Sequence, residues 1–356
     1  MICPWTIYQC YDDTRLLEEQ YESMTGWVNF MHSRVSSDYI WRGDFQFGDW
    51  LDYRGEDSRN PNPVTNRKLI ATAFFAYSTG LLAKMAEALG CSEDAGRYKE
   101  LAAKVKAAFN NEFVTPSGRV GPNTQTAYVL ALHFDLLPDA VRPIAAERLA
   151  NEIRQGQYHM ATGFVGTPYL CHGLSRFGYT DVSYKLLNQE EYPSWLYPVK
   201  LGATTIWERW DDIKPDSTFQ DASMNSFNHY AYGAIGDWLY QVVAGIKIDP
   251  NIPGYKRFHI HPQPGGGLTY ARAGYDSMYG LIESSWKLEK ESWDLTATIP
   301  ANTEGVIYLP AQSTADITEG GQTLDQVEGI WDIRQEDGTV VLTLGAGQYH
   351  FSTRIH

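Results

Sequence analysis

Ten residues in the second half of the chain combine two tryptophans with four charged side chains. In "ATTIWERWDD" (203–212), Glu208 lies between Trp207 and Trp210, with Arg209 as its neighbour. Aromatic neighbours would exclude water from the Glu208 carboxyl group and disfavour its charge, whereas Arg209 would favour it. A carboxyl group in such surroundings can serve as acid, base or nucleophile when a glycosidic bond is cleaved. On spacing alone, a structural Glu208–Arg209 pair is the simpler interpretation.

Two other segments carry side chains suited to binding a sugar. "FGDWLD" (47–52) places Asp49 and Trp50 in a glycine-marked loop, where they could bind hydroxyl groups and stack on a ring face. The alternative is an aspartate cap beside a core tryptophan. "NSFNHYAYGA" (225–234) is expected to start a helix, with His229 in its first turn as a donor to a sugar hydroxyl. A core histidine with satisfied hydrogen bonds is the alternative there.

Sequence motifs for metals, phosphates and serine nucleophiles are absent. There is no HExxH pair and no GxSxG turn, and "PGGGLT" lacks the Lys-Ser/Thr of a phosphate-binding loop. The four cysteines form no CxxC pair, so buried free thiols are expected rather than a zinc cluster or disulfides. We therefore predict no metal site and no cofactor.

The composition favours a carbohydrate ligand over nucleic acid or a membrane. The chain has 11 Trp, 23 Tyr and 14 Phe, which suits sugar stacking, although aromatic residues can also simply fill a large core. The net charge is −14 and no Lys/Arg-rich run occurs, which disfavours nucleic acid. No signal peptide and no apolar run of about 18 residues is apparent, so no membrane span is expected and the cytoplasm is favoured.

The positioning of these residues depends on the elements around them. Apolar periodicity predicts eight or nine helices up to residue 250, in which nearly apolar helices such as 65–90 alternate with amphipathic ones such as 92–114, where Ser92 is the expected cap. This alternation predicts a double-layered helical barrel, and we find no fixed repeat for a helical solenoid. The loops 36–64 and 192–221 hold most of the candidate residues and are expected to meet at one rim.

The pattern changes near residue 250. A Pro/Gly-rich linker at 249–267 is followed by short runs in which β-branched and aromatic residues alternate with polar ones. These runs predict an antiparallel β-sandwich of roughly 100 residues. We therefore predict two domains, a helical barrel over 1–250 and a β-sandwich over 251–356.

Several segments taken in order resemble a known family. "FGDWLD", "YPSWLYPVKLGATTIWERWD" and "SFNHYAYGAIGDWLYQVVAGI" are similar to bacterial α-L-rhamnosidases of glycoside hydrolase family 78, and the resemblance covers nearly the whole chain. It implies an (α/α)6 barrel followed by a β-sandwich, and release of terminal α-L-rhamnose from glycosides or oligosaccharides with inversion. It assigns the general base to Glu208. The candidate substrate-binding residues are Asp49, Trp50, Trp195, Trp207, Trp210 and His229.

One part of the family pattern is missing. The family's general acid lies in an Arg-Asp-Glu-Arg-Leu-Gly-Trp type motif, and no such string occurs here. The chain therefore resembles the C-terminal part of a rhamnosidase without the first barrel helices, and it is expected to be weak or inactive alone. Neither Asp49 nor Asp211 is an obvious replacement acid, because a hydroxyl-binding role suits both better. A non-catalytic rhamnose-binding barrel and a purely structural fragment are the alternatives.

The same interpretation predicts how the chain would associate. Missing barrel helices would expose the apolar flanks of their neighbours, and surfaces of this kind tend to be covered by another chain. We therefore expect self-association through the open barrel edge near residues 1–35.

Overall fold

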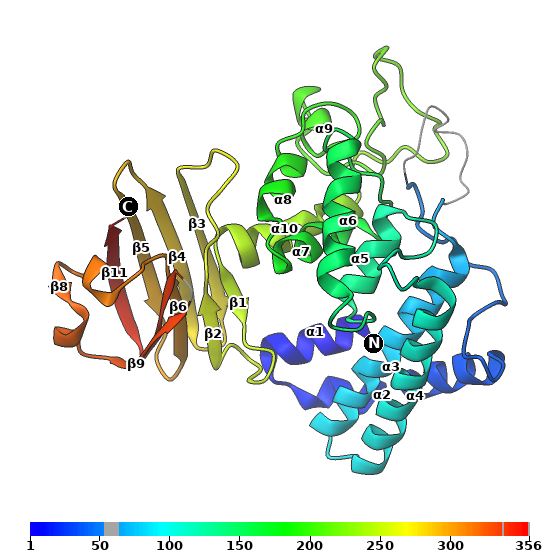
Figure 1. Cartoon of the computed structure of the whole chain (residues 1–356), viewed down its shortest axis with the longest axis horizontal. Helices are drawn as coiled ribbons and strands as arrows, with labels where there is room; N and C mark the ends of the chain where they lie inside the picture. The colour runs from blue at the N-terminus through cyan, green and yellow to red at the C-terminus, as the bar shows by residue number, and fades with distance from the viewer. Residues whose placement is uncertain (53–63, 337, 355–356) are drawn as a thin grey trace. The chain divides into compact units, whose positions relative to one another are not determined.

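The computed structural model of the chain describes residues 1–52, 64–336 and 338–354. Contacts divide the chain into two units (Figure 1). The first is helical and comprises Met1–Ile2 and Glu18–Ile235, and the second comprises Cys3–Leu17 and Gly236–His356. The domain boundary predicted at residue 250 stays a prediction.

The helical unit is built around three helical hairpins. α3 (Arg67–Ala88) pairs with α4 (Ser92–Phe113), α5 (Gln125–His133) with α6 (Arg142–Gln155), and α7 (Thr167–Arg176) with α8 (Thr180–Leu187). α5 also contacts α3 and α7, and it is buried along almost its whole length. α4 and α6 bury only one stripe. The predicted alternation of inner and outer helices is confirmed.

Helix α3 shows why an inner helix is so apolar. Asn66 caps its start by accepting a hydrogen bond from the N–H of Lys68 at 2.9 Å, and Gly90 follows its end with φ 72°. An 18-residue window of α3 has a mean hydropathy of 1.4, so α3 is long and apolar enough to cross a membrane. The expectation that no such run exists was therefore wrong. However, 67% of this window is buried, as befits a helix packed on two sides by α4 and α5.

Three local predictions were wrong. Cys91, rather than Ser92, is the N-cap of α4, and its side chain makes no capping bond. The helix expected over 226–245 begins only at residue 231, as a short 3₁₀ turn followed by α10 (Ile235–Trp238) and a π turn. The cysteines are free, but only Cys171 is buried, whereas Cys3 and Cys91 are exposed.

The remaining helices are α1 (Ile2–Tyr11), α2 (Thr14–Arg34) and α9 (Leu196–Lys200).

The β-rich unit contains two sheets. The five-stranded sheet has the order β1-β2-β6-β10-β9, and the six-stranded sheet has the order β3-β4-β5-β11-β7-β8. All pairings are antiparallel except that of β2 with β6. The strands are β1 (Ile246–Ile248), β2 (Arg257–Ile260), β3 (Tyr270–Ser277), β4 (Gly280–Leu288), β5 (Ser292–Ile299), β6 (Glu304–Leu309), β7 (Ile317–Glu319), β8 (Gln322–Thr323), β9 (Ile330–Glu336), β10 (Thr339–Leu344) and β11 (Gly347–Arg354).

Side-chain alternation explains the strands that were predicted. Along β5 every second residue is buried, starting at Trp293, because successive side chains point to opposite faces of a strand. The alternating runs predicted after the linker correspond to β3, β4, β5, β6, β10 and β11. β1 and β2 were missed because they flank the Pro/Gly-rich stretch or lie inside it, and β7, β8 and β9 were also not predicted.

Candidate active site

Glu208 lies on a loop segment that is hydrogen-bonded to a second segment downstream. The N–H of Glu208 donates to the carbonyl of Ser226 at 2.8 Å, and the N–H of His229 donates to the carbonyl of Ile206 at 2.8 Å. The hydroxyl of Thr205 also donates to the carbonyl of Phe227. Because this pairing uses the backbone of 226–229, His229 precedes the helix instead of lying in its first turn. The predicted base and the predicted hydroxyl donor therefore occupy neighbouring segments.

The Glu208 carboxylate is half-buried and held by the facing segment. Its Oε2 accepts a hydrogen bond from the N–H of Ser226 at 3.1 Å. Trp207 and Trp210, on either side of it in the chain, are both buried. This arrangement holds one carboxylate oxygen of Glu208 while the side chain remains partly accessible.

The neighbouring charges form a buried cluster of their own. Arg209 donates through Nε to Oδ1 of Asp211 at 3.2 Å, and Gln220 donates to Oδ2 of Asp211 at 2.6 Å. Arg209 and Asp211 are both buried. Asp211 is thus engaged at both oxygens by protein donors, which disfavours the hydroxyl-binding role considered for it.

Buried aromatic rings flank the segment that carries Glu208. The rings of Trp210 and Tyr232 stack with centroids 3.8 Å apart, and the Trp195 ring meets Trp210 edge-to-face at 5.8 Å. Trp195 also donates through Nε1 to the carbonyl of Tyr232 at 2.9 Å. Within the described part of the chain, Nε1 of Trp210 and the hydroxyl of Tyr232 have no hydrogen-bond partner.

Asp49 is fully buried, and protein donors engage both of its oxygens. Its carboxylate accepts hydrogen bonds from the N–H groups of Gly163 at 2.8 Å, Val165 at 2.8 Å and Gly166 at 3.0 Å, and from the hydroxyl of Thr126. Burial raises the pKa of Asp49, and these hydrogen bonds oppose the rise. Asp49 therefore caps the turn that precedes α7, which favours the capping alternative over direct contact with a sugar.

Trp50 is brought to the site by the same turn. Its carbonyl accepts from the N–H of Phe164 at 2.9 Å. The Phe164 ring in turn stacks on His229 at 5.0 Å and meets Tyr232 edge-to-face at 5.2 Å. Phe164 thus links the Trp50 loop to the segment that carries His229.

An open aromatic surface extends from Trp50. The Trp50 ring is half-buried and meets Phe47 edge-to-face at 5.4 Å, and Phe47 meets Phe45 in the same way at 5.0 Å. Phe47 is 59% exposed and Phe45 is 78% exposed. Rings that present accessible faces and edges can contact sugar C–H groups. Trp50 is half-buried, whereas Trp195, Trp207 and Trp210 are buried, so Trp50 is the most accessible of these four tryptophans.

Replacing Gly163 with alanine is expected to displace the Trp50 loop. A Cβ at this position would lie 2.1 Å from the carbonyl oxygen of Trp50 and 2.6 Å from the amide nitrogen of Asp52, both of which are backbone atoms. We expect a loss of roughly 2–4 kcal/mol in the free energy of unfolding, measured by urea denaturation. Gly26→Ala in α2 is the control, because its Cβ meets nothing within 4 Å and should leave stability equal or slightly higher.

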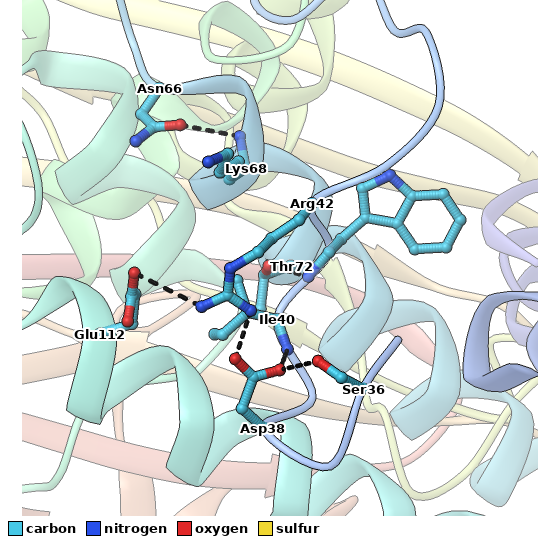
Figure 2. A network of polar contacts seen from close by, with 9 residues as sticks. Ser36, Asp38, Ile40, Arg42, Asn66, Lys68, Thr72 and Glu112 are labelled. Carbon is cyan, nitrogen blue, oxygen red and sulfur yellow. Dashed lines mark hydrogen bonds and ion pairs between the residues drawn. The ribbon is translucent and has the colours of Figure 1, made fainter. Parts of the chain in front are cut away.

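A polar network anchors the start of the loop that carries Asp49 and Trp50. Figure 2 shows Arg42 between Asp38 and Glu112, with an ion pair to Asp38 and a second, at 3.8 Å, to Glu112 of α4. Asp38 also accepts from the hydroxyl of Ser36 at 2.8 Å. The N–H of Trp41 donates to the hydroxyl of Thr72 in α3 at 3.1 Å. The loop is therefore tied to the α3/α4 hairpin before it reaches Asp49.

The structure adds residues that the sequence did not single out. Phe164, Tyr232 and Ser226 contact predicted site residues, and Asp212 and Asn225 lie behind Glu208. In the sequence, the only feature that could have pointed to Asp212 is its place as the second aspartate of "RWDD", next to the tryptophans. Over residues 1–52, 64–336 and 338–354, no group of three or more His, Cys, Asp or Glu side chains could hold a metal ion.

Comparisons with known proteins place the chain among families of known name. Residues 1–243 match the family model of the bacterial alpha-L-rhamnosidase six-hairpin glycosidase domain, and residues 245–324 match the bacterial alpha-L-rhamnosidase C-terminal domain. The chain is 40% identical over 349 residues to an alpha-L-rhamnosidase of Streptomyces avermitilis, covering 98% of this chain and 32% of the relative. It is 39% identical over 355 residues to one from Formosa agariphila, covering 99% of this chain and 38% of the relative.

A solved structure is similar over the same range. The crystal structure of the Streptomyces avermitilis alpha-L-rhamnosidase complexed with L-rhamnose matches with a TM-score of 0.88 and 39% identity, covering 98% of this chain and 32% of that one. The chain thus spans about a third of the length of the relatives it matches.

Proposed function

Because this chain belongs to the family of bacterial α-L-rhamnosidases, we propose that it acts on glycosides or oligosaccharides that end in α-L-rhamnose. The observation that carries the proposal is the placement of Glu208. Its carboxylate is half-buried, flanked in the chain by buried tryptophans, and held at Oε2 by the N–H of Ser226. The similar structure from Streptomyces avermitilis is a complex with L-rhamnose, which supports the choice of sugar.

In the proposed mechanism Glu208 is the general base of an inverting hydrolysis. The Ser226 N–H holds one oxygen of the Glu208 carboxylate and directs the side chain, and the carboxylate accepts a proton from a water molecule. The water oxygen forms a bond to the anomeric carbon as the glycosidic bond breaks, and an acid protonates the leaving oxygen. Inversion requires that the two carboxyl groups lie roughly 6.5–9.5 Å apart, with room for the water.

None of the residues assigned to the site serves as the general acid. The 356 residues contain no Arg-Asp-Glu-Arg-Leu-Gly-Trp type string, and the nearby candidates Asp49 and Asp211 are buried and engaged by protein donors. We therefore propose that the chain by itself binds rhamnose but hydrolyses rhamnosides weakly or not at all. A non-catalytic rhamnose-binding protein is the second candidate, and the same two buried aspartates favour it.

Calorimetry and a hydrolysis assay test the proposal together. We expect titration with L-rhamnose to give saturable binding, and D-glucose, which differs in several hydroxyl configurations, to give none. An aryl α-L-rhamnoside then distinguishes an enzyme from a binding protein. Absence of L-rhamnose binding by the folded chain would contradict both candidates.

We also propose that the chain self-associates through α2, within the edge predicted from residues 1–35. Trp27 is 51% exposed and Phe30 is 44% exposed, and their rings stack 5.7 Å apart. Exposed aromatic pairs of this kind are typical of contact surfaces.

Light scattering at micromolar concentrations is expected to show a dimer or larger species, and Trp27→Glu should shift it towards monomer. Ser23→Glu on the same helix is the control, and a monodisperse wild-type monomer would refute the proposal.

A further inference from the structure

Asp212 lies directly behind the candidate base and is completely buried, with 0% exposure. Its Oδ2 accepts a hydrogen bond from the N–H of Glu208 at 3.1 Å. With its amide oriented so that both groups are satisfied, Asn225 donates through Nδ2 to Oδ1 of Asp212 at 2.8 Å and to its main-chain oxygen at 3.1 Å. The Asp212 carboxylate therefore links Glu208 to the facing segment 225–229.

The facing segment is the one that holds the Glu208 side chain. Asn225 immediately precedes Ser226, whose carbonyl accepts from the Glu208 N–H at 2.8 Å and whose N–H donates to Glu208 Oε2 at 3.1 Å. Loss of the Asp212 carboxylate would leave the Glu208 N–H with only its bond to the Ser226 carbonyl, and the Asn225 amide with only its bond to the main-chain oxygen of residue 212. The Asp212 carboxylate thus reinforces the pairing of the two segments that orients the Glu208 side chain.

We propose that Asp212 is a positioning residue for Glu208, which it holds through the Glu208 N–H and through Asn225, and that the charge of Glu208 acts on the Asp212 carboxyl group. The proposal rests on the proposed function, because it gives Glu208 the role of base. Asp212 itself is too deeply buried to touch a substrate.

The electrostatics of the pair support this coupling. Burial is the main cause that raises the pKa of Asp212 to about 7, and the charge of Glu208 raises it further. Hydrogen bonds from the N–H groups of Arg209 and Glu208, together with the charge of Arg209, act in the opposite direction. The charged groups that face Asp212 are thus Glu208 and Arg209 on its own segment, while Asn225 on the facing segment is neutral.

The coupling has a definite effect on stability. In the unfolded chain an aspartate titrates near pH 3.9, whereas folded Asp212 keeps its proton to about pH 7. The folded state therefore binds more protons between these values, and stability falls as pH rises from about 4 to about 7. Removing the charge of Glu208 should lower the pKa of Asp212 and shift the end of this fall to lower pH.

The first arm of the test measures melting temperature against pH without any ligand. Between pH 4.5 and 7.5 the wild-type Tm is expected to fall by roughly 5 °C relative to Asp212→Asn, which cannot titrate. In Glu208→Gln the midpoint of this fall is expected to move down by roughly half to one pH unit. Asp216→Asn, an exposed position in the same loop, is the control and should follow wild type.

The second arm measures L-rhamnose affinity by calorimetry. Asp212→Ala is expected to bind at least about tenfold more weakly, whereas Asp212→Asn, which can still accept from the Glu208 N–H, should stay within about threefold of wild type. Wild-type affinity in a folded Asp212→Ala protein would overturn the proposal, as would an unchanged midpoint in Glu208→Gln. If Asp212→Ala fails to fold, the first arm decides. If wild type binds no rhamnose, the proposed function fails, and the ligand-free arm still decides whether Asp212 and Glu208 are coupled.

Discussion

Replacing Glu208 with glutamine is expected to lower the rate of aryl α-L-rhamnoside hydrolysis by about 10²–10⁴-fold, whatever rate the wild-type chain shows. Glutamine has nearly the same shape, and its amide oxygen can still accept from the N–H of Ser226, as Oε2 of Glu208 does at 3.1 Å. It cannot take a proton from water, so the base is lost while the packing and hydrogen bond of the side chain are kept. L-rhamnose affinity should therefore change much less than the rate.

The control for this variant is Glu190→Gln, which removes an exposed carboxylate paired with Lys200 at 2.6 Å and should leave the rate unchanged. Initial rates with a chromogenic rhamnoside and calorimetry with L-rhamnose give the two required readouts. When the wild-type chain shows measurable turnover, an unchanged rate in Glu208→Gln would place the base elsewhere. Robust wild-type turnover that depends on Glu208 would instead show that the chain does contain an acid, and that the expectation of weak activity is wrong.

The fold was predictable wherever periodicity was strong. Inner helices such as α3 and α5 must bury several faces, and strands such as β5 bury every second residue, so both leave clear patterns in the sequence. The segment 226–230 misled because its local sequence favours helix, while its backbone N–H and carbonyl groups bond to 206–208 instead. The hydrogen bonds between these two separate segments prevent a helix at 226–230, and sequence periodicity cannot reveal such bonds.

The candidate site residues could be named from the sequence, but their orientation could not. A carboxyl group flanked by aromatic residues drew attention to Glu208, and the resemblance rather than the spacing assigned its role as base. The sequence around Asp49 could not show that its oxygens face Gly163, Val165 and Gly166, which lie 114 to 117 residues away. The same holds for Asp212, which is buried and accepts a hydrogen bond from Asn225, 13 residues further along the chain. In a sequence, a buried carboxylate in a polar loop cannot be told from a surface carboxylate, because the N–H groups that bind it belong to other segments.

Replacing Asp49 with alanine is expected to lower the free energy of unfolding by roughly 3–5 kcal/mol, because the backbone N–H groups of Gly163, Val165 and Gly166 would lose a buried acceptor. Urea denaturation followed by tryptophan fluorescence measures the loss. Asp139→Ala removes an exposed carboxylate that is ion-paired to Arg142, and it should cost less than about 1 kcal/mol.

The Asp49→Ala result also decides between the two roles considered for this residue. If Asp49 caps the turn before α7, rhamnose affinity should fall together with stability, because Trp50 and Phe164 are held by the same turn. If Asp49 instead binds a sugar hydroxyl, affinity should fall while the free energy of unfolding changes by less than about 1 kcal/mol. The burial of Asp49 and its bonds to three backbone N–H groups make the first result the expected one, since a carboxylate that accepts those bonds has little capacity left for a ligand.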